Sequence, residues 1–321
     1  MANLIFELGG KLEEKIYQSS FKTTIGGQAL IEGIMMRGPE EISIAVRNPD
    51  NEIIIKNQEI NSLEKKYKFL SLPIIRGAYR LIEAMVIGTK ALTYSASFYD
   101  EEEAGYLEKK YGEKGEKVAT GLSVFASFIV AIVVFTLIPN LLATLIGKYV
   151  ESTFVLNLIE GIVRIMIFLI YLEFTKKLEE IQRVFMYHGA EHKTIHCYEN
   201  RLPLTVENVK KFPRMHPRCG TSFIFMVMVV SILVLSFFGW PNPVMRILIR
   251  ILALPLIAGI SYEINRVIGR SDSKIAKFFT KPGLFIQKHF TVLEPEDDQI
   301  EVAICALKEV IPKDGVSDLW K

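Results

Sequence analysis

Four long apolar runs constrain this chain more than any other feature of its sequence. They cover residues 122–138 (extending toward 146), 154–174, 221–240 and 244–262. An α-helix rises 1.5 Å per residue, so about 20 helical residues cross the roughly 30 Å hydrocarbon core of a bilayer. Half of the 321 residues are hydrophobic, in keeping with this interpretation. The sequence therefore predicts a mainly α integral membrane protein with four transmembrane helices.

The distribution of basic residues predicts the orientation of these helices. Nine Lys or Arg residues lie in segment 175–220, whereas the opposite loops are short and have little beyond Lys148 and Arg246. The positive-inside rule places segment 175–220 in the cytoplasm, and an even number of spans places both termini there. We therefore expect a multi-pass cell-membrane protein with cytoplasmic N- and C-termini. The start of the chain has no basic segment followed by a long apolar core, so we expect no cleavable signal peptide.

The net charge and the cysteine content narrow the classes of partner that we expect. The formal net charge is only +2, which gives no argument for binding nucleic acid. We expect the lipid bilayer as the main partner, together with a membrane or cytoplasmic protein. The three cysteines have no repeated spacing and would be reduced in the cytoplasm, so a disulfide framework is not expected.

The N-terminal part divides into two predicted regions. Residues 1–72 form a cytoplasmic α+β region, because alternating Ile42, Ile44 and Val46 are followed by a Pro/Asp/Asn turn and more isoleucines. This pattern predicts a β-hairpin with a preceding strand. Residues 73–117 contain an amphipathic helix over 74–98 and then a charged linker. An interfacial helix is the preferred interpretation, and a re-entrant or fifth hydrophobic segment is the alternative.

The C-terminal part also divides in two. Residues 118–262 form the four-helix membrane domain, which includes the cytoplasmic segment 175–220. Residues 263–321 form a cytoplasmic tail with a helix that begins in the acidic run 294–298, where acidic side chains suit the helix dipole. The apolar residues of that helix share one face and are expected to dock on the cytoplasmic domain. They are Ile300, Ala303, Ile304, Leu307 and Ile311.

Histidine and cysteine gather in one short part of the chain. Of the eight His and Cys residues, six lie within 188–219, where an even spread would place fewer than one. On a helix, His188 and His192 are one turn apart and differ by about 40° around the axis, with Glu191 beside them. Two imidazoles at this spacing can bind one divalent ion.

We therefore predict a divalent metal site, with zinc as the favoured ion. The predicted ligands are His188, His192, His216 and Cys219, and the further candidates are His196, Glu199 and Glu263. The order His-x-x-Glu-His matches the inverted zincin pattern, in which Glu191 would be the catalytic general base acting on water. This arrangement predicts a metal-dependent enzyme, most plausibly a hydrolase, at the cytoplasmic membrane face.

Two other functions remain open at this stage. A Cys/His site closed by four protein ligands would be structural, and the protein would then be a membrane scaffold or a transport accessory protein. Glu160, Arg164 and Arg250 lie inside the apolar runs, where charges usually pair or line a polar path. An ion pair between helices is the preferred interpretation of these three residues, and a transport path is the alternative.

Four separate motifs carry a resemblance to a known family. They are GGQALIEGIMMRGP at 26–39, YHGAEHKTI at 187–195, HPRCGTSF at 216–223 and EPEDDQIEVAI at 294–304. Over nearly its whole length the chain resembles the YqhQ-like bacterial membrane-protein family, a domain family of unknown function. The resemblance implies an integral membrane protein. Similar proteins are described as predicted metal-dependent enzymes, and the resemblance implies no substrate.

Overall fold

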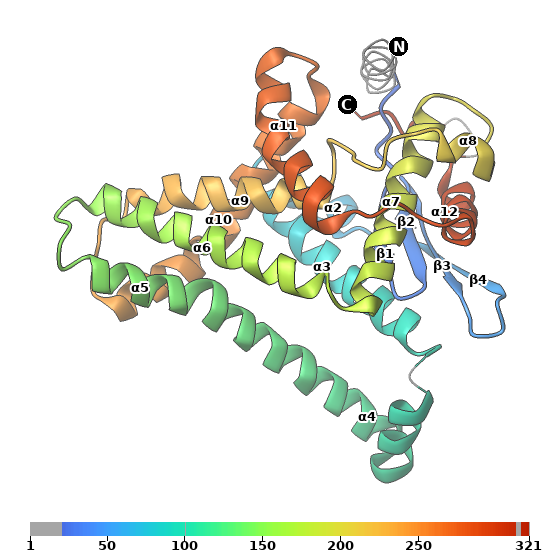
Figure 1. The fold of residues 1–321 in the computed structure, drawn as a ribbon, viewed down its shortest axis with the longest axis horizontal. Helices are drawn as coiled ribbons and strands as arrows, with labels where there is room; N and C mark the ends of the chain where they lie inside the picture. Colours follow the sequence, from blue (N-terminus) through green and yellow to red (C-terminus); the bar gives the residue numbers. More distant parts are fainter. Residues whose placement is uncertain (1–20, 100, 313–315, 321) are drawn as a thin grey trace, which may run out of the picture.

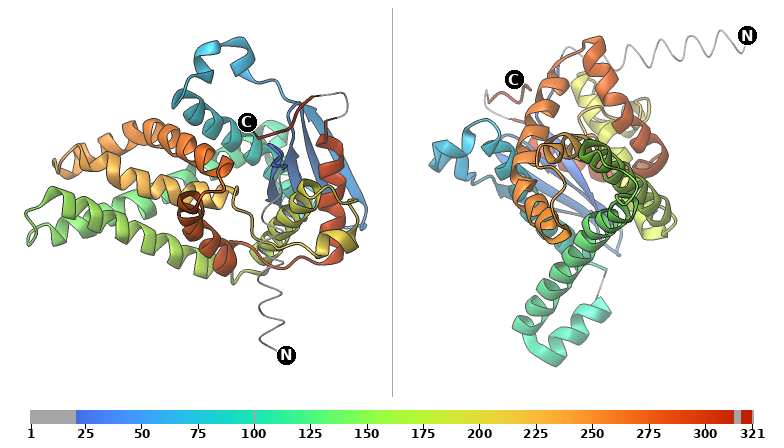
Figure 2. Two further views of the ribbon diagram at one scale, coloured as in Figure 1. Left: turned by 90° about the horizontal axis from the view of Figure 1, so that it is seen from above. Right: turned by 90° about the vertical axis from the view of Figure 1, so that its left-hand side faces the viewer.

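The computed structural model describes residues 21–99, 101–312 and 316–320, so the start of the chain, with our signal-peptide prediction, lies outside the described residues. A small β-sheet with helices packed on it lies at one end of the molecule. A bundle of long helices extends away from this end, as Figure 1 shows. The left view of Figure 2, from above, shows the same division.

The sheet has four antiparallel strands in the order β1–β2–β3–β4. The strands are β1 (Gly26–Leu30), β2 (Gly33–Arg37), β3 (Glu41–Arg47) and β4 (Ile53–Glu59). The predicted hairpin is confirmed as β3–β4. Two strands precede it where we expected one, because the chain reverses between β1 and β2 at Ile31 and Glu32. Glu32 adopts a positive φ of 48° there, a conformation that its side chain does not signal in the sequence.

Helices cover both faces of the sheet. Because side chains alternate along a strand, Ile34 and Met36 pack on one face and Met35 and Ile44 on the other. The first face is covered by α7 (Glu179–Glu199) and α12 (Asp297–Val310), and the second by α3 (Ile75–Ala96). The result is a three-layer α/β/α arrangement with its apolar core on either side of the sheet.

The predicted C-terminal helix is confirmed as α12. A capping box between Glu296 and Gln299 fixes its start, and Ile300, Ala303 and Leu307 are fully buried against α7 and the sheet. The remaining short elements connect the layers. They are α2 (Leu63–Lys66), η1 (Lys68–Ser71), α8 (Val206–Lys210), α11 (Lys274–Ile286) and the π-helical turn η3 (Gln287–Thr291).

Among the residues that the structure describes, three helical stretches are long and apolar enough to cross a membrane. They are Gly121–Ile146, Thr153–Thr175 (α6) and Pro243–Arg270 (α10). The first stretch combines the end of α4 (Glu101–Ile132), the π-helical turn η2 (Val133–Leu137) and α5 (Ile138–Ile146). The predicted run 221–240 forms α9 (Gly220–Ser236), an apolar helix of 17 residues. Apolar helices thus occupy all four predicted runs, and three of them have full spanning length.

The helix boundaries differ from the predicted ones at three places. Residues 101–117 belong to α4, which is interrupted only at Gly112, so the expected linker is helical. The second apolar helix ends at Thr175, and a turn separates it from α7, so the histidines lie on a helix of their own. The predicted domain boundary after residue 262 falls inside α10.

The charged residues of the apolar helices form an ion pair, as preferred. Glu160 in α6 accepts a hydrogen bond of 2.8 Å from Arg164, one turn further along the helix. Its other carboxylate oxygen contacts Arg250 of α10. Charges that pair inside an apolar bundle offset the cost of their burial. This contact ties α6 to α10.

The burial of α12 predicts a test of the core. Leu307→Ala removes a fully buried side chain, and such a change in a packed core costs about 2–5 kcal/mol. The free energy of unfolding in detergent should fall by that amount. Leu202→Ala is the matched control, because Leu202 is 42% exposed and its truncation should change the value little. Equal losses for the two variants would contradict the packing of α12.

Candidate functional site

The candidate site is carried by α7, a helix with an unusually polar interior. Two glutamates in its first turn favour a helix start there, because acidic side chains suit the N-terminal end of the helix dipole. From Gly189 to Cys197 every residue is buried, including Glu191, His192 and His196. Buried polar groups need partners, so the surroundings of α7 determine what these side chains can do.

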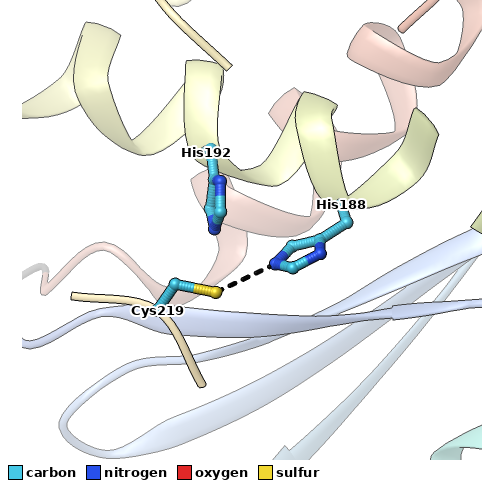
Figure 3. Close-up of side chains that lie close together, drawn as sticks. All are labelled: His188, His192 and Cys219. Carbon is cyan, nitrogen blue, oxygen red and sulfur yellow. Dashed lines mark hydrogen bonds between the residues drawn. The ribbon is translucent and has the colours of Figure 1, made fainter. Parts of the chain in front are cut away.

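The first group consists of two histidines of α7, His188 and His192, and of Cys219, which lies outside that helix. One ligand atom from each lies within 4.8 Å of the other two, and the His188 Nε2 to Cys219 Sγ distance is 3.1 Å. Figure 3 shows the two imidazoles on successive turns of α7 with the cysteine facing them. Cys219 is the N-cap of α9, where its Sγ accepts the amide N–H of Thr221. A helix N-terminus favours the thiolate form of such a cysteine.

Backbone carbonyls fix the orientation of both imidazoles. Nδ1 of His188 lies 2.9 Å from the carbonyl oxygen of Thr291, and Nδ1 of His192 lies 2.7 Å from that of Arg214. A carbonyl oxygen only accepts, so each Nδ1 carries the proton and a neutral ring keeps the lone pair on Nε2. Burial lowers the pKa of His192 to about 4, so this ring is neutral at pH 7. This is the usual geometry of a metal-binding histidine with its outer-shell partner.

Glu191 shares a cavity with this group. The cavity has a volume of about 330 Å³ and is lined by His188, His192, Cys219 and Glu191, among others. Oε1 of Glu191 accepts the amide N–H of Gly27 in β1 at 2.9 Å. Burial raises the pKa of Glu191 to about 7, although the Gly27 amide opposes this shift. A carboxyl group that can take or release a proton near neutral pH therefore lies beside the His/Cys group.

A second group lies one turn further along α7. It consists of His196, Glu199 and His216, all buried, and one ligand atom from each lies within 4.8 Å of the others. Nε2 of His216 lies 3.6 Å from Oε2 of Glu199, while Oε1 of Glu199 accepts the amide of Thr23 and contacts Arg218. Burial lowers the pKa of both histidines and raises that of Glu199.

In the structure the predicted metal ligands are divided between two groups and do not form a single site. His216 lies with His196 and Glu199, and its ring centroid is 5.6 Å from that of His192, so the two groups are adjacent. Gln287 determines this position, because its side-chain amide bonds both the N–H and the carbonyl of His216 at 2.9 Å. Among the described residues, Glu263 belongs to neither group and forms an ion pair with Arg76.

The backbone partners of the site could not be predicted from the sequence. Thr291, Arg214 and Gly27 act through main-chain atoms, so their side-chain identities gave no signal. Gly27 is the one of these three residues whose identity does carry a signal. A Cβ on Gly27 would lie 2.7 Å from the carbonyl oxygen of Met35 and 3.0 Å from Cδ of Glu191, so only glycine lets β1 approach α7 this closely.

This close approach predicts a contrast between neighbouring glycines. Gly27→Ala should lower the free energy of unfolding by about 1–3 kcal/mol, because the added methyl group overpacks the contact with Glu191. Gly26→Ala is the matched control, since a Cβ there meets nothing within 4 Å. Thermal unfolding of the two purified variants measures the difference. If Gly27→Ala is as stable as Gly26→Ala, β1 does not pack on α7 as described.

Comparison with known proteins places the chain among uncharacterised relatives. A family described as "Protein of unknown function (DUF1385)" matches residues 72–313. The "Uncharacterized protein YqhQ" of Bacillus subtilis (strain 168) is 34% identical over 310 residues, which cover 91% of this chain and 94% of that protein. No solved structure matches the chain. The chain therefore belongs to the YqhQ-like family of proteins of unknown function, DUF1385.

Proposed function

We propose that the protein is a membrane-embedded, metal-dependent hydrolase. One observation carries this proposal. Two histidines have Nδ1 bonded to carbonyl oxygens, and one ligand atom of each lies within 4.8 Å of the Sγ of Cys219, in a cavity whose wall includes Glu191. Three protein ligands leave room for a fourth, exchangeable ligand, as in catalytic zinc sites.

The donor set supports zinc as the ion. Imidazole nitrogen and thiolate sulfur are its usual protein ligands, and both are supplied by His188, His192 and Cys219. The lowered pKa of His192 fits a neutral nitrogen ligand. The outer shell also fits, because backbone carbonyls orient both rings.

Each residue then has a definite role. When bound, such an ion acidifies water and polarises carbonyl or phosphoryl oxygens. Glu191 takes the proton from water through Oε2, while the Gly27 amide holds Oε1. Burial excludes bulk water from α7, which strengthens these polar interactions. The adjacent group of His196, Glu199 and His216 offers the ligands for an ion of its own.

The proposed topology places this site at the cytoplasmic end of the bundle. In it α9 completes four spans, although it has only 17 residues, and Trp240 and the following Pro-Asn-Pro turn meet the far interface. The nine basic residues of 175–220 support a cytoplasmic position for α7. Because Cys219 caps α9, the site lies where this helix enters the membrane.

The ligand set predicts how metal content responds to cysteine substitution. Cys219→Ser removes the thiolate ligand, so the metal occupancy of the His188, His192 and Cys219 group, measured by elemental analysis of the purified protein, should fall at least about tenfold. Cys197→Ser is the matched control, because Cys197 is a buried cysteine of α7 that lies outside both groups, and the metal content of this variant should not change.

The number of metal ions bound per chain tests the group of His196, Glu199 and His216 as well. Two ions per chain, with one retained in Cys219→Ser, would assign the other to His196, Glu199 and His216. Wild-type protein and both variants with the same negligible metal content would contradict the proposed metal centre.

A second substitution separates catalysis from a structural role. Glu191→Gln keeps the hydrogen bond from Gly27 but loses the proton acceptor, so metal content and thermal stability should stay near wild type. In vivo complementation should fail, since loss of a general base costs about 10²–10⁴-fold in rate. His192→Ala should lose metal and complementation together. A fully functional Glu191→Gln variant would support the structural alternative, a membrane scaffold or transport accessory protein.

A further inference from the structure

A second and larger cavity adjoins the candidate site. Its volume is about 750 Å³, against about 330 Å³ for the cavity that contains His188 and Glu191. Cys219 lies in the walls of both cavities, and so do Arg218 and Trp320. A ligand held in the larger cavity therefore lies next to the proposed metal ligands.

Arginine dominates the charged wall of this larger cavity. Within the part of the chain that the structure describes, the wall contains a single carboxyl group, that of Glu64, and five arginines. The arginines are Arg37, Arg76, Arg80, Arg218 and Arg266.

Carboxylates behind the wall hold several of these arginines in place. Glu83 contacts Arg37 and Arg80, Glu263 contacts Arg76, and Glu199 contacts Arg218. Glu64, in the wall itself, contacts Arg80 as well, so carboxylates hold four of the guanidinium groups in fixed positions around the cavity.

Two of the arginines keep donors for a ligand. The contact with Glu83 uses one nitrogen of Arg37, and the contact with Glu263 uses two nitrogens of Arg76. A guanidinium group has five N–H donors on three nitrogens, so both side chains retain donors. Their fork geometry matches phosphate, which arginine binds in a bidentate manner. The wall is therefore suited to an anionic phosphate group.

The position of the cavity indicates what else the ligand contains. The N-terminal end of α9 supplies Phe223, α10 supplies Tyr262, where the apolar run 244–262 ends, and α3 supplies Leu81 and Ala84. In the proposed topology these residues lie at the membrane surface. Polar and apolar wall residues thus meet at the depth where lipid headgroups join their chains.

We propose that the larger cavity binds the phosphate-bearing headgroup of a membrane amphiphile. The arginines recognise the phosphate, and the apolar wall contacts the first part of the chain. The assignment of this ligand as substrate rests on the proposed function, because it requires the neighbouring cavity to be catalytic. Binding itself requires neither metal nor turnover.

The test is equilibrium binding to the full-length protein in an uncharged detergent. The probes are a short-chain phosphatidic acid, a diacylglycerol with the same chains, and glycerol 3-phosphate. We expect phosphatidic acid to bind at least about tenfold more tightly than either of the other two. Diacylglycerol lacks the charge-assisted hydrogen bonds to phosphate, and glycerol 3-phosphate lacks the chains that contact the apolar wall. Equal binding of glycerol 3-phosphate would instead assign the site to a soluble phosphate ester.

Variants locate the binding in the cavity. Arg37→Gln and Arg76→Gln should each weaken phosphatidic acid binding about tenfold or more and leave diacylglycerol binding unchanged. Arg47→Gln is the matched control, because Arg47 is also ion-paired, with Glu301, but lies outside both cavities. Retained metal content and thermal stability identify the variants that are folded.

Two results would overturn the proposal. One is diacylglycerol binding as tight as that of phosphatidic acid, and the other is an equal effect of Arg47→Gln and the cavity variants. Because Glu191→Gln protein should bind phosphatidic acid like wild type, failure of the catalytic proposal and failure of this one are distinguishable. If the wild-type protein contains metal but does not bind phosphatidic acid, only the proposed headgroup site is rejected.

Discussion

The fold depends on the burial of one polar helix, α7, by backbone groups from distant parts of the chain. Glu191 and Glu199 accept main-chain N–H groups of residues 27 and 23, whereas His188 and His192 bond carbonyls of residues 291 and 214. A buried polar group left without its partner costs about 1–3 kcal/mol. These contacts therefore position β1, the segment before α9 and the end of η3, and the same contacts orient the candidate ligands.

The sequence predicts the regular part of this arrangement well. The alternation of Ile42, Ile44 and Val46 predicts strand β3, and the shared apolar face that includes Ile300 and Leu307 predicts a docked α12. The four-residue spacing of the α7 histidines places both on one face. These features depend on local periodicity alone, which a single sequence contains.

The irregular part could not be predicted, because distant groups determine it. The segment from Arg214 to Cys219 has no periodicity, and the amide of Gln287 sets its path. His216 is therefore turned toward Glu199, and Cys219 alone joins the first two histidines. Similarly, Gly27 matters through a contact 164 residues away, and the turn at Glu32 lacks the glycine or asparagine that usually marks one. A single sequence does not reveal such contacts, because the two partners lie far apart in the chain and neither one produces a local pattern that points to the other.

The position of the site at the end of the apolar helices has a physical consequence for the ligand. Withdrawing a lipid chain from hydrocarbon into water costs about 0.8 kcal/mol for each CH₂ group. Cys219 is the N-cap of α9 and lies in both cavities, so in the proposed topology a headgroup reaches it while its chains remain in the bilayer. A soluble enzyme would have to offset that cost with an apolar pocket of its own. A small polar domain fixed to helix ends avoids it, and this is the arrangement that α7, the sheet and the apolar bundle produce together.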